Sequence, residues 1–394
     1  MRRLLIASAV LAVAAVPAAA AQAKVPKGPA GIAFYTPPAP LPGSGHGGLI
    51  RARKLTGDGV LGNASRNQLL LYRSVGVDGE PIAVSGTVAV PKGKAPRGGW
   101  PIITYAHGTT GIADACAPTL DKNGTSVHTL NSYAYPLLER WLKAGYAVVR
   151  TDYEGLGTPG AHPYLVGRSE GYSVLDAARA ARRFMPRLSK KTIIAGHSQG
   201  GHAALWAASL ERSWTPELKV RGTVAFAPAS HIADQGRLLR NLTTPSGLSG
   251  LAAMIIRGLD TGNPGLIQTT DLGDRAAALY PDSLTECLPD LSQTDSFGGL
   301  APADIFRSDV NLDPFIAALA ANDPEHLAIS TPVRIDQGTA DGTVFQTFTD
   351  RLAEDYRGRN VKLTYKTYEG VSHGGVVTSA ARNATRWIRG KLRG

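Results

Sequence analysis

The residue of this chain with the clearest capacity for catalytic chemistry is a serine that has a glycine two positions before it and another two positions after it. Ser198 lies in the pentapeptide Gly-His-Ser-Gln-Gly at 196–200, after the apolar segment 192–195 and before the small-residue segment 202–210. A strand, a tight turn and a helix in this order form a nucleophile elbow, which exposes the serine hydroxyl at the end of a sheet. The pattern therefore predicts that Ser198 is a nucleophile.

The same five-residue pattern occurs a second time, around Ser169. Pro163 precedes it, only the three residues 164–166 could form a strand, and the helix that follows starts better at Ser173. Because the context of an elbow is missing there, we interpret Ser169 as a turn residue.

A serine hydroxyl is a weak nucleophile, so it needs a base and an orienting acid. In an elbow fold these residues follow later strands, in the chain order serine, acid, histidine. His373 follows the last predicted strand, and Asp341 follows the strand predicted at 333–337, whereas Asp336 lies inside that strand and is expected to be structural. The sequence predicts a triad of Ser198, Asp341 and His373.

Acyl transfer also needs two N–H groups that stabilise the developing oxyanion. The residue after the nucleophile, Gln199, supplies one, and Thr109 in the loop after the third strand is expected to supply the other. His107 is expected to pack beneath that loop. Glu154 follows an earlier strand, so we interpret it as a structural or pocket-wall residue.

The rest of the sequence supplies the elements that would position these residues. Two β-rich segments, at 67–75 and 82–90, flank a turn and predict a hairpin. Short apolar strands then alternate with helices, which predicts a mostly parallel α/β sheet with helices on both faces. The strands are expected at 101–106, 146–152, 192–195 and 220–226, and the helices at 130–144, 173–185 and 201–212.

The alternation stops between about 228 and 331, where helical spacing at 248–259 and 313–321 replaces the strand pattern. It resumes with a strand at 333–337, a helix at 345–357, a strand at 361–368 and a helix at 375–392. We therefore expect a helical cap inserted into the core. The predicted organisation is a signal peptide at 1–23, an extended N-terminal arm at 24–66, a first core part at 67–228, the cap at 229–331 and a second core part at 332–394.

The first residues have the composition of a secretory signal. Arg2 and Arg3 precede an apolar run at 4–16, which is too short to span a bilayer, and later segments are not apolar enough to do so. We expect an extracellular protein without a transmembrane segment. The net charge of +11 is interpreted as solvated surface charge, with attraction to anionic lipid surfaces as the alternative. Nucleic-acid binding is not expected, because no basic run is interleaved with aromatic residues.

Two cysteines, Cys116 and Cys287, are present in the chain. In an oxidising compartment they are expected to form one disulfide, with two buried thiols as the alternative. No pair of histidines has convincing metal-ligand spacing, so neither a metal nor a cofactor is expected.

The motifs also resemble those of the secretory lipase family, lipase A type, of the α/β hydrolases. The resemblance runs over nearly the whole chain after residue 33 and includes the segments 34–38, 105–111, 152–159, 162–167, 196–201 and 337–341. It implies the α/β-hydrolase fold and a secreted lipase or carboxylesterase, with a helical cap over an acyl-binding pocket. It supports Ser198, Asp341 and His373 as the triad, and a disulfide from the oxyanion-side loop to the cap.

The expected function is thus hydrolysis of acyl esters through an acyl-enzyme intermediate. A lipid or other acyl ester is the expected partner, and the sequence is compatible with contact at lipid interfaces. A secreted peptidase or aryl esterase on the same fold is the alternative enzyme, since a fold alone does not fix the substrate. A non-catalytic surface-binding protein is the alternative from a different class.

Overall fold

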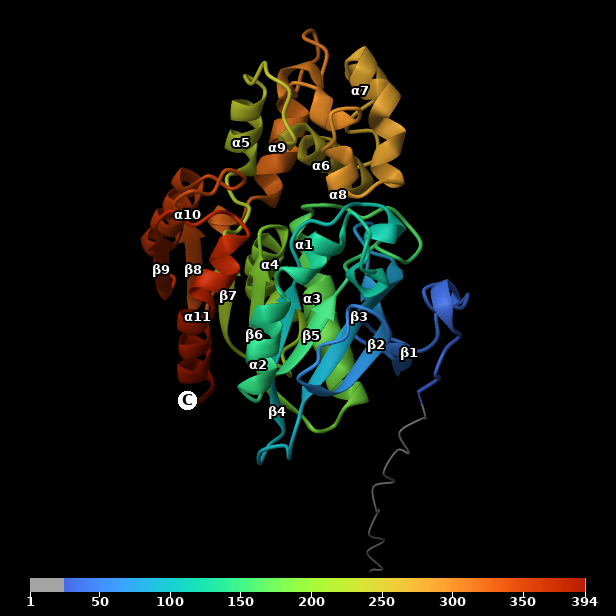
Figure 1. Ribbon diagram of the computed structural model, residues 1–394, viewed down its shortest axis with the longest axis vertical. Helices are drawn as coiled ribbons and strands as arrows, with labels where there is room; N and C mark the ends of the chain where they lie inside the picture. The colour runs from blue at the N-terminus through green and yellow to red at the C-terminus, as the bar shows by residue number, and fades with distance from the viewer. Residues whose placement is uncertain (1–24, 394) are drawn as a thin grey trace, which may run out of the picture.

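A nine-stranded sheet forms the centre of the computed structural model, which describes residues 25–393 (Figure 1). The strand order is β1-β2-β3-β5-β4-β6-β7-β8-β9. The pairings from β1 as far as β5 are antiparallel, and all the following pairings are parallel, which confirms the predicted mostly parallel α/β sheet. The predicted signal peptide at 1–23 lies outside the described residues. The strands are β1 (Leu49–Lys54), β2 (Ala64–Val75), β3 (Pro81–Pro91), β4 (Trp100–Ala106), β5 (Ala147–Thr151), β6 (Leu188–His197), β7 (Lys219–Phe226), β8 (Val333–Gly338) and β9 (Leu363–Tyr368).

Helices cover both faces of this sheet because neighbouring strand residues point to opposite sides. Ile194 packs in a core with residues of α3 (Gly167–Phe184), α4 (Gln199–Trp214) and α10 (Gln346–Gly358). The adjacent Ile193 packs in a second core, with residues of α2 (Tyr135–Lys143) and α11 (Gly375–Arg393). The apolar strands are therefore buried on both sides, as their composition predicts.

Three elements differ from the sequence prediction. The helix expected at 130–144 is two helices, α1 (His128–Ser132) and α2, because Pro136 lies in the first turn of α2 and cannot continue a preceding helix. Helix α3 begins at Gly167 rather than at Ser173, so Ser169 lies in its first turn and not in a loop. The edge strand β1 was not predicted, and it pairs antiparallel with β2.

The helical segment between β7 and β8 lies over the end of the sheet where the parallel strands finish (Figure 1). Its apolar side chains form a core that also includes Ile112, Tyr164 and Leu165 from loops below it. This shared core joins the segment, which we call the cap, to the sheet domain. The helices of the cap are α5 (Ile232–Leu239), α6 (Leu248–Gly262), α7 (Asp274–Leu279), α8 (Leu288–Leu291) and α9 (Asp313–Asn322).

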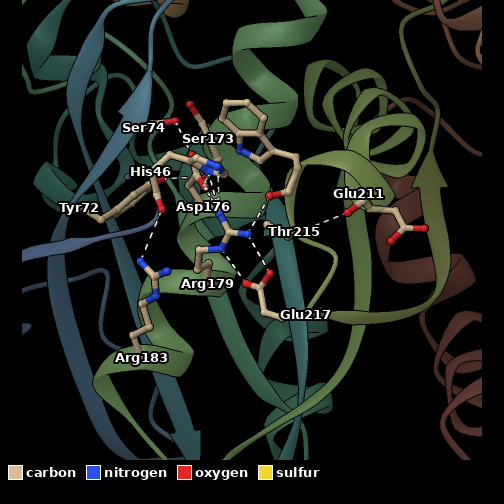
Figure 2. A network of polar contacts seen from close by, with 11 residues as sticks. His46, Tyr72, Ser74, Ser173, Asp176, Arg179, Arg183, Glu211, Thr215 and Glu217 are labelled. Atoms are coloured by element: carbon tan, nitrogen blue, oxygen red, sulfur yellow. Dashed lines mark hydrogen bonds and ion pairs between the residues drawn. The ribbon is translucent and has the colours of Figure 1, made fainter. Parts of the chain in front are cut away.

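The segment before β1 is attached to helix α3 by a polar network (Figure 2). His46 Nδ1 lies 2.7 Å from a carboxylate oxygen of the buried Asp176, and the His46 ring stacks on Trp214. On the same helix, Arg179 donates two hydrogen bonds to the carboxylate of Glu217. His46 therefore anchors the segment before β1 to the body of the protein.

Candidate active site

The turn that carries Ser198 has the strained geometry of a nucleophile elbow. Ser198 joins β6 to α4 with φ 58° and ψ −120°, a conformation that non-glycine residues rarely adopt. A Cβ atom at Gly196 would lie 1.8 Å from the carbonyl oxygen of Gly200, and one at Gly200 would lie 2.0 Å from the carbonyl oxygen of Ala106. Both glycines are thus required by close backbone contacts, and they allow the tight turn that presents the serine.

Asp341 and His373 are directly hydrogen bonded. Asp341 follows β8, and its Oδ2 lies 2.7 Å from His373 Nδ1, in the loop after β9. The other carboxylate oxygen of Asp341 accepts the backbone N–H groups of Thr343 and Val344, each at 2.9 Å. Since a carboxylate can only accept, His373 donates Nδ1–H, which leaves Nε2 as the basic nitrogen.

A cavity of about 620 Å³ brings the predicted residues to one place. Ser198 and His373 both line it, and so does Thr109. Much of the remaining wall is apolar, and the cap contributes Ile232 and Leu239 of α5 and the α6 residues Leu248, Leu251 and Ile255 to it. The structure therefore places a buried serine and a histidine–carboxylate pair beside a pocket suited to an apolar group.

The predicted oxyanion residues lie on either side of the nucleophile. Gln199 is the first residue of α4, so its N–H has no partner within the helix and points from the positive end of the helix dipole. The Thr109 hydroxyl lies 2.7 Å from the hydroxyl of Tyr164, another residue of the cavity wall. Both positions are thus close to the end of the strand that bears Ser198.

His197, which the sequence placed in the elbow without a role, supports the loop of His373. Its Nε2 donates to the His373 carbonyl oxygen at 3.0 Å, so its Nδ1 accepts the hydroxyl proton of Tyr133 at 2.6 Å. Burial and the neighbouring His373 hold the pKa of His197 well below its usual value. The His197 ring is therefore neutral and does not take the proton that an attacking serine would release.

The Gln199 side chain belongs to a buried polar network that sequence reasoning missed. Its Nε2 donates to His162 Nε2 and to Glu170 Oε1, both at 2.8 Å. His162 donates through Nδ1 to the Glu154 carbonyl oxygen, which leaves its Nε2 as an acceptor, and burial lowers its pKa. These contacts fix the side chain of the residue whose N–H is a predicted oxyanion donor.

His202 completes this network one turn further along α4. Its Nδ1 lies 2.8 Å from Glu170 Oε2, and its Nε2 lies 2.8 Å from the carbonyl oxygen of Asn322, at the end of cap helix α9. Both neighbours are acceptors, so both ring nitrogens carry protons. Burial lowers the pKa of His202, but the hydrogen bond and charge of Glu170, together with the Asn322 carbonyl and the charge of Asp323, raise it overall. A buried ion pair thus links the nucleophile helix to the cap.

Gln337 is a further residue without a sequence signal. It is fully buried in β8, and its Nε2 lies 3.1 Å from Asp341 Oδ2 while its Oε1 accepts the Thr349 hydroxyl at 2.9 Å. Gln337 thus holds the Asp341 carboxylate toward His373.

The other polar candidates have structural partners. Ser169 is buried and donates to the carboxylate of Glu154, whose pKa burial raises to about 7. Asp336 forms a buried ion pair with Arg334. Burial lowers the pKa of His107 to about 4, and its Nδ1 lies 2.7 Å from the Gly108 carbonyl oxygen. Glu154, Asp336 and His107 are not among the residues that line the described cavity.

The expected disulfide joins Cys116 to Cys287. It connects the loop after β4 to the cap, and the Leu288 N–H donates to the Thr110 carbonyl oxygen beside it at 2.9 Å. Within residues 25–393, no group of three or more His, Cys, Asp or Glu side chains is arranged to hold a metal ion. No helix in this same range is long and apolar enough to cross a membrane.

Comparison with known proteins agrees with this fold. The family described as "Secretory lipase" matches residues 123–394, and the chain belongs to that family. The "Probable inactive lipase MT1628" of Mycobacterium tuberculosis is 28% identical over 92% of this chain and 82% of its own length. "Lipase A" of Moesziomyces aphidis is 31% identical over 59% of this chain, which spans 49% of that protein.

Among solved structures, Candida antarctica lipase A in its closed state has a TM-score of 0.78 with this chain. It is 22% identical, and the match covers 91% of this chain and 85% of that one. This likeness confirms the predicted α/β-hydrolase fold.

Proposed function

We propose that this protein is a secreted serine hydrolase that cleaves carboxylic esters of apolar acyl groups, as a lipase or carboxylesterase. The observation that carries the proposal is the Asp341–His373 pair, whose histidine lines the same apolar cavity as the elbow serine Ser198. Family membership supports ester hydrolysis in general. An extracellular location is supported by the same membership and by secreted lipase relatives.

In the proposed reaction, His373 Nε2 removes the Ser198 proton while Ser198 Oγ attacks the ester carbonyl carbon. The carbonyl oxygen becomes an oxyanion, which the N–H groups of Gln199 and Thr109 stabilise. Collapse breaks the bond to the alcohol oxygen, and His373 returns the proton to the departing alcohol. Water, activated by the same nitrogen, then hydrolyses the acyl-enzyme and regenerates Ser198.

Asp341 would act by holding one tautomer of His373 and by stabilising the imidazolium that forms during attack. The two backbone N–H groups and Gln337 donate to the Asp341 carboxylate and hold it in place. We propose that the cap wall, chiefly α5 and α6, receives the acyl chain, because five apolar side chains of these two helices line the cavity.

A non-catalytic binding protein is the second candidate. It is favoured by one observation, the relative whose name describes a probable inactive lipase. The two candidates differ in one property, which is the reactivity of Ser198.

A fluorophosphonate probe tests that reactivity directly. We expect the wild-type protein and Ser169→Ala to be labelled and Ser198→Ala not to be labelled. Ser198→Ala should also lower kcat for p-nitrophenyl esters by several orders of magnitude, on the scale of about 10⁶ for loss of a triad serine. Absence of labelling in folded wild-type protein would favour the non-catalytic binding protein instead. Labelling of Ser169 would identify Ser169, rather than Ser198, as the nucleophile.

A further inference from the structure

Exposed cations gather at the end of the sheet that lies opposite the cap. We call this surface the basic end and define it by Lys92, Lys94, Arg97, Arg187, Lys190 and Lys219, all of which are exposed. They lie in the loops that precede the parallel strands β4 and β6, or in the first residues of β6 and β7. In Figure 1 the loop between β3 and β4 extends beyond the sheet at the end away from the cap.

These loops form one continuous surface. The N–H of Trp100, at the start of β4, donates to the Arg187 carbonyl oxygen at 2.9 Å. Lys191, next to Lys190, pairs with Lys219 in the register of β6 and β7. The cations are therefore close together at the end of the sheet where β4, β6 and β7 begin, although they are far apart in the sequence.

The segments that form this surface contribute almost no carboxylates of their own. The segments 92–99, 185–191 and 215–219 contain a single acidic residue, Glu217. Its carboxylate already accepts two hydrogen bonds from Arg179 (Figure 2). The positive charge of the basic end is thus left to solvent or to a partner.

A hollow of about 560 Å³ opens between two of these loops. Trp100, Phe184 and Met185 form part of its apolar wall, and the exposed Arg66 and Arg187 also line it. Apolar walls beside cations match the chemistry of an amphiphile with a negative head group. Cations spread over several loops suit a broad charged surface better than a single strand held in a groove.

We propose that the basic end docks the protein on a membrane surface that contains anionic phospholipids. The catalytic cavity lies at the other end of the strands, under the cap, so a docked molecule would keep this cavity facing away from the membrane. This surface is separate from the substrate site, and the proposal does not depend on whether the protein is an active enzyme.

Co-sedimentation with vesicles tests this docking. We expect the wild-type protein to bind vesicles of phosphatidylcholine mixed with phosphatidylglycerol, and not vesicles of phosphatidylcholine alone. Each cation near an anionic bilayer contributes about a fivefold gain in partitioning, so the triple variant Lys92→Gln, Lys94→Gln, Arg97→Gln should bind on the order of 100-fold more weakly. Binding of the wild type should also fall steeply as salt is added.

A matched control removes three exposed cations from the cap end, in Lys122→Gln, Arg168→Gln, Arg240→Gln. This variant loses the same net charge and should keep wild-type binding. Thermal unfolding of both variants verifies that they are folded. Equal losses in the two variants, equal binding of the wild type to both kinds of vesicle, or a preference for duplex DNA over the vesicles at equal phosphate concentration would each overturn the proposal.

Discussion

Two neighbouring histidines at the elbow are expected to have different roles because their hydrogen bonds differ. His197 and His373 have ring centroids 4.5 Å apart. His197 is held neutral by burial and by the neighbouring His373, whereas His373 is paired with a carboxylate through Nδ1, which leaves Nε2 as its basic nitrogen. At the scale of single residues, the surroundings decide which histidine can act as the base.

Replacing Asp341 distinguishes its proposed role in catalysis from a role in folding alone. Asp341→Asn should preserve the cavity but lower kcat by about 10⁴-fold, because an amide would favour the wrong tautomer of His373. The measurement is kcat on a soluble ester, together with the unfolding temperature. Asp336→Asn is the matched comparison, since it breaks the buried pair with Arg334 and should mainly lower stability. If Asp336→Asn lowered kcat more than Asp341→Asn at unchanged stability, the assignment of the acid would be wrong.

The buried pair of His202 and Glu170 should make stability depend on pH. The pKa of His202 is raised in the folded protein, so its contribution is complete below the unfolded pKa and is lost as pH rises through the folded pKa. The free energy of unfolding of the wild type should therefore exceed that of His202→Gln most at about pH 5.5, and the difference should shrink toward about pH 9.

Chemical denaturation of both proteins across this range measures the effect. His326→Gln serves as the control, because His326 is exposed and its loss should leave the pH dependence of the wild type unchanged. A gap between wild type and His202→Gln that stays constant with pH would show that His202 is neutral in the folded protein.

At the scale of the element, helix α6 has two apolar sides. Leu251 and Ile255 line the cavity, whereas Ala253 and Met254 are buried in the core of the cap. A helix with one buried stripe would need fewer apolar residues, so the excess is explained by the cavity wall.

Larger side chains in this cavity wall should change which ester the protein prefers. Leu251→Trp and Ile255→Trp should lower kcat/KM for long acyl chains more than for short ones, since one methylene in an apolar pocket changes discrimination by roughly 1–3 kcal/mol. The measurement is kcat/KM for p-nitrophenyl esters of increasing chain length. Thr261→Trp, a partly exposed position on the same helix outside the cavity lining, is the control. If neither wall variant changed the ratio of long to short esters, the acyl group would bind elsewhere.

Elements were predicted well where a local pattern specifies them. The hairpin, the parallel strands and helices α6 and α9 were found from apolar spacing alone. Strand β1 was missed because its sequence, Leu-Ile-Arg-Ala-Arg-Lys, has a polar half and follows a Pro- and Gly-rich segment. The early start of α3 was missed because no side chain caps its first residue.

Partners that lie far apart in sequence were not predictable in the same way. Asp341 and His373 could be placed because each follows a strand, and the order of such residues is fixed by the topology. Gln337 and the network of Glu170 and His202 carry no spacing signal, since their contacts depend on how helices α3 and α4 and strand β8 pack. Candidate reactive residues can be predicted from local context, whereas the residues that hold them in place become visible only in the folded structure.

At the scale of the molecule, the disulfide spans 171 residues of sequence and fastens the cap to the loop after β4. Removing it with Cys116→Ala and Cys287→Ala should lower the free energy of unfolding by about 5 kcal/mol on the chain-entropy model. Denaturant titration gives this value, and mass spectrometry of non-reduced digests should show the two cysteine peptides linked in secreted wild-type protein. Free thiols in that material, or unchanged stability of the double variant, would contradict the expectation.

The position of the cap within the chain sets the order in which a ribosome delivers the reactive groups. Ser198 precedes the cap, while Asp341 and His373 follow it, on loops after β8 and β9 at one edge of the sheet. Chains fold from their N-terminal part as they emerge. A nascent chain that has been translated as far as α9 thus contains the elbow but neither the acid nor the base of the proposed triad. Hydrolytic chemistry would begin only after the last sixth of the protein had been made and docked, so prematurely terminated products would be inert toward esters of the cell that makes them.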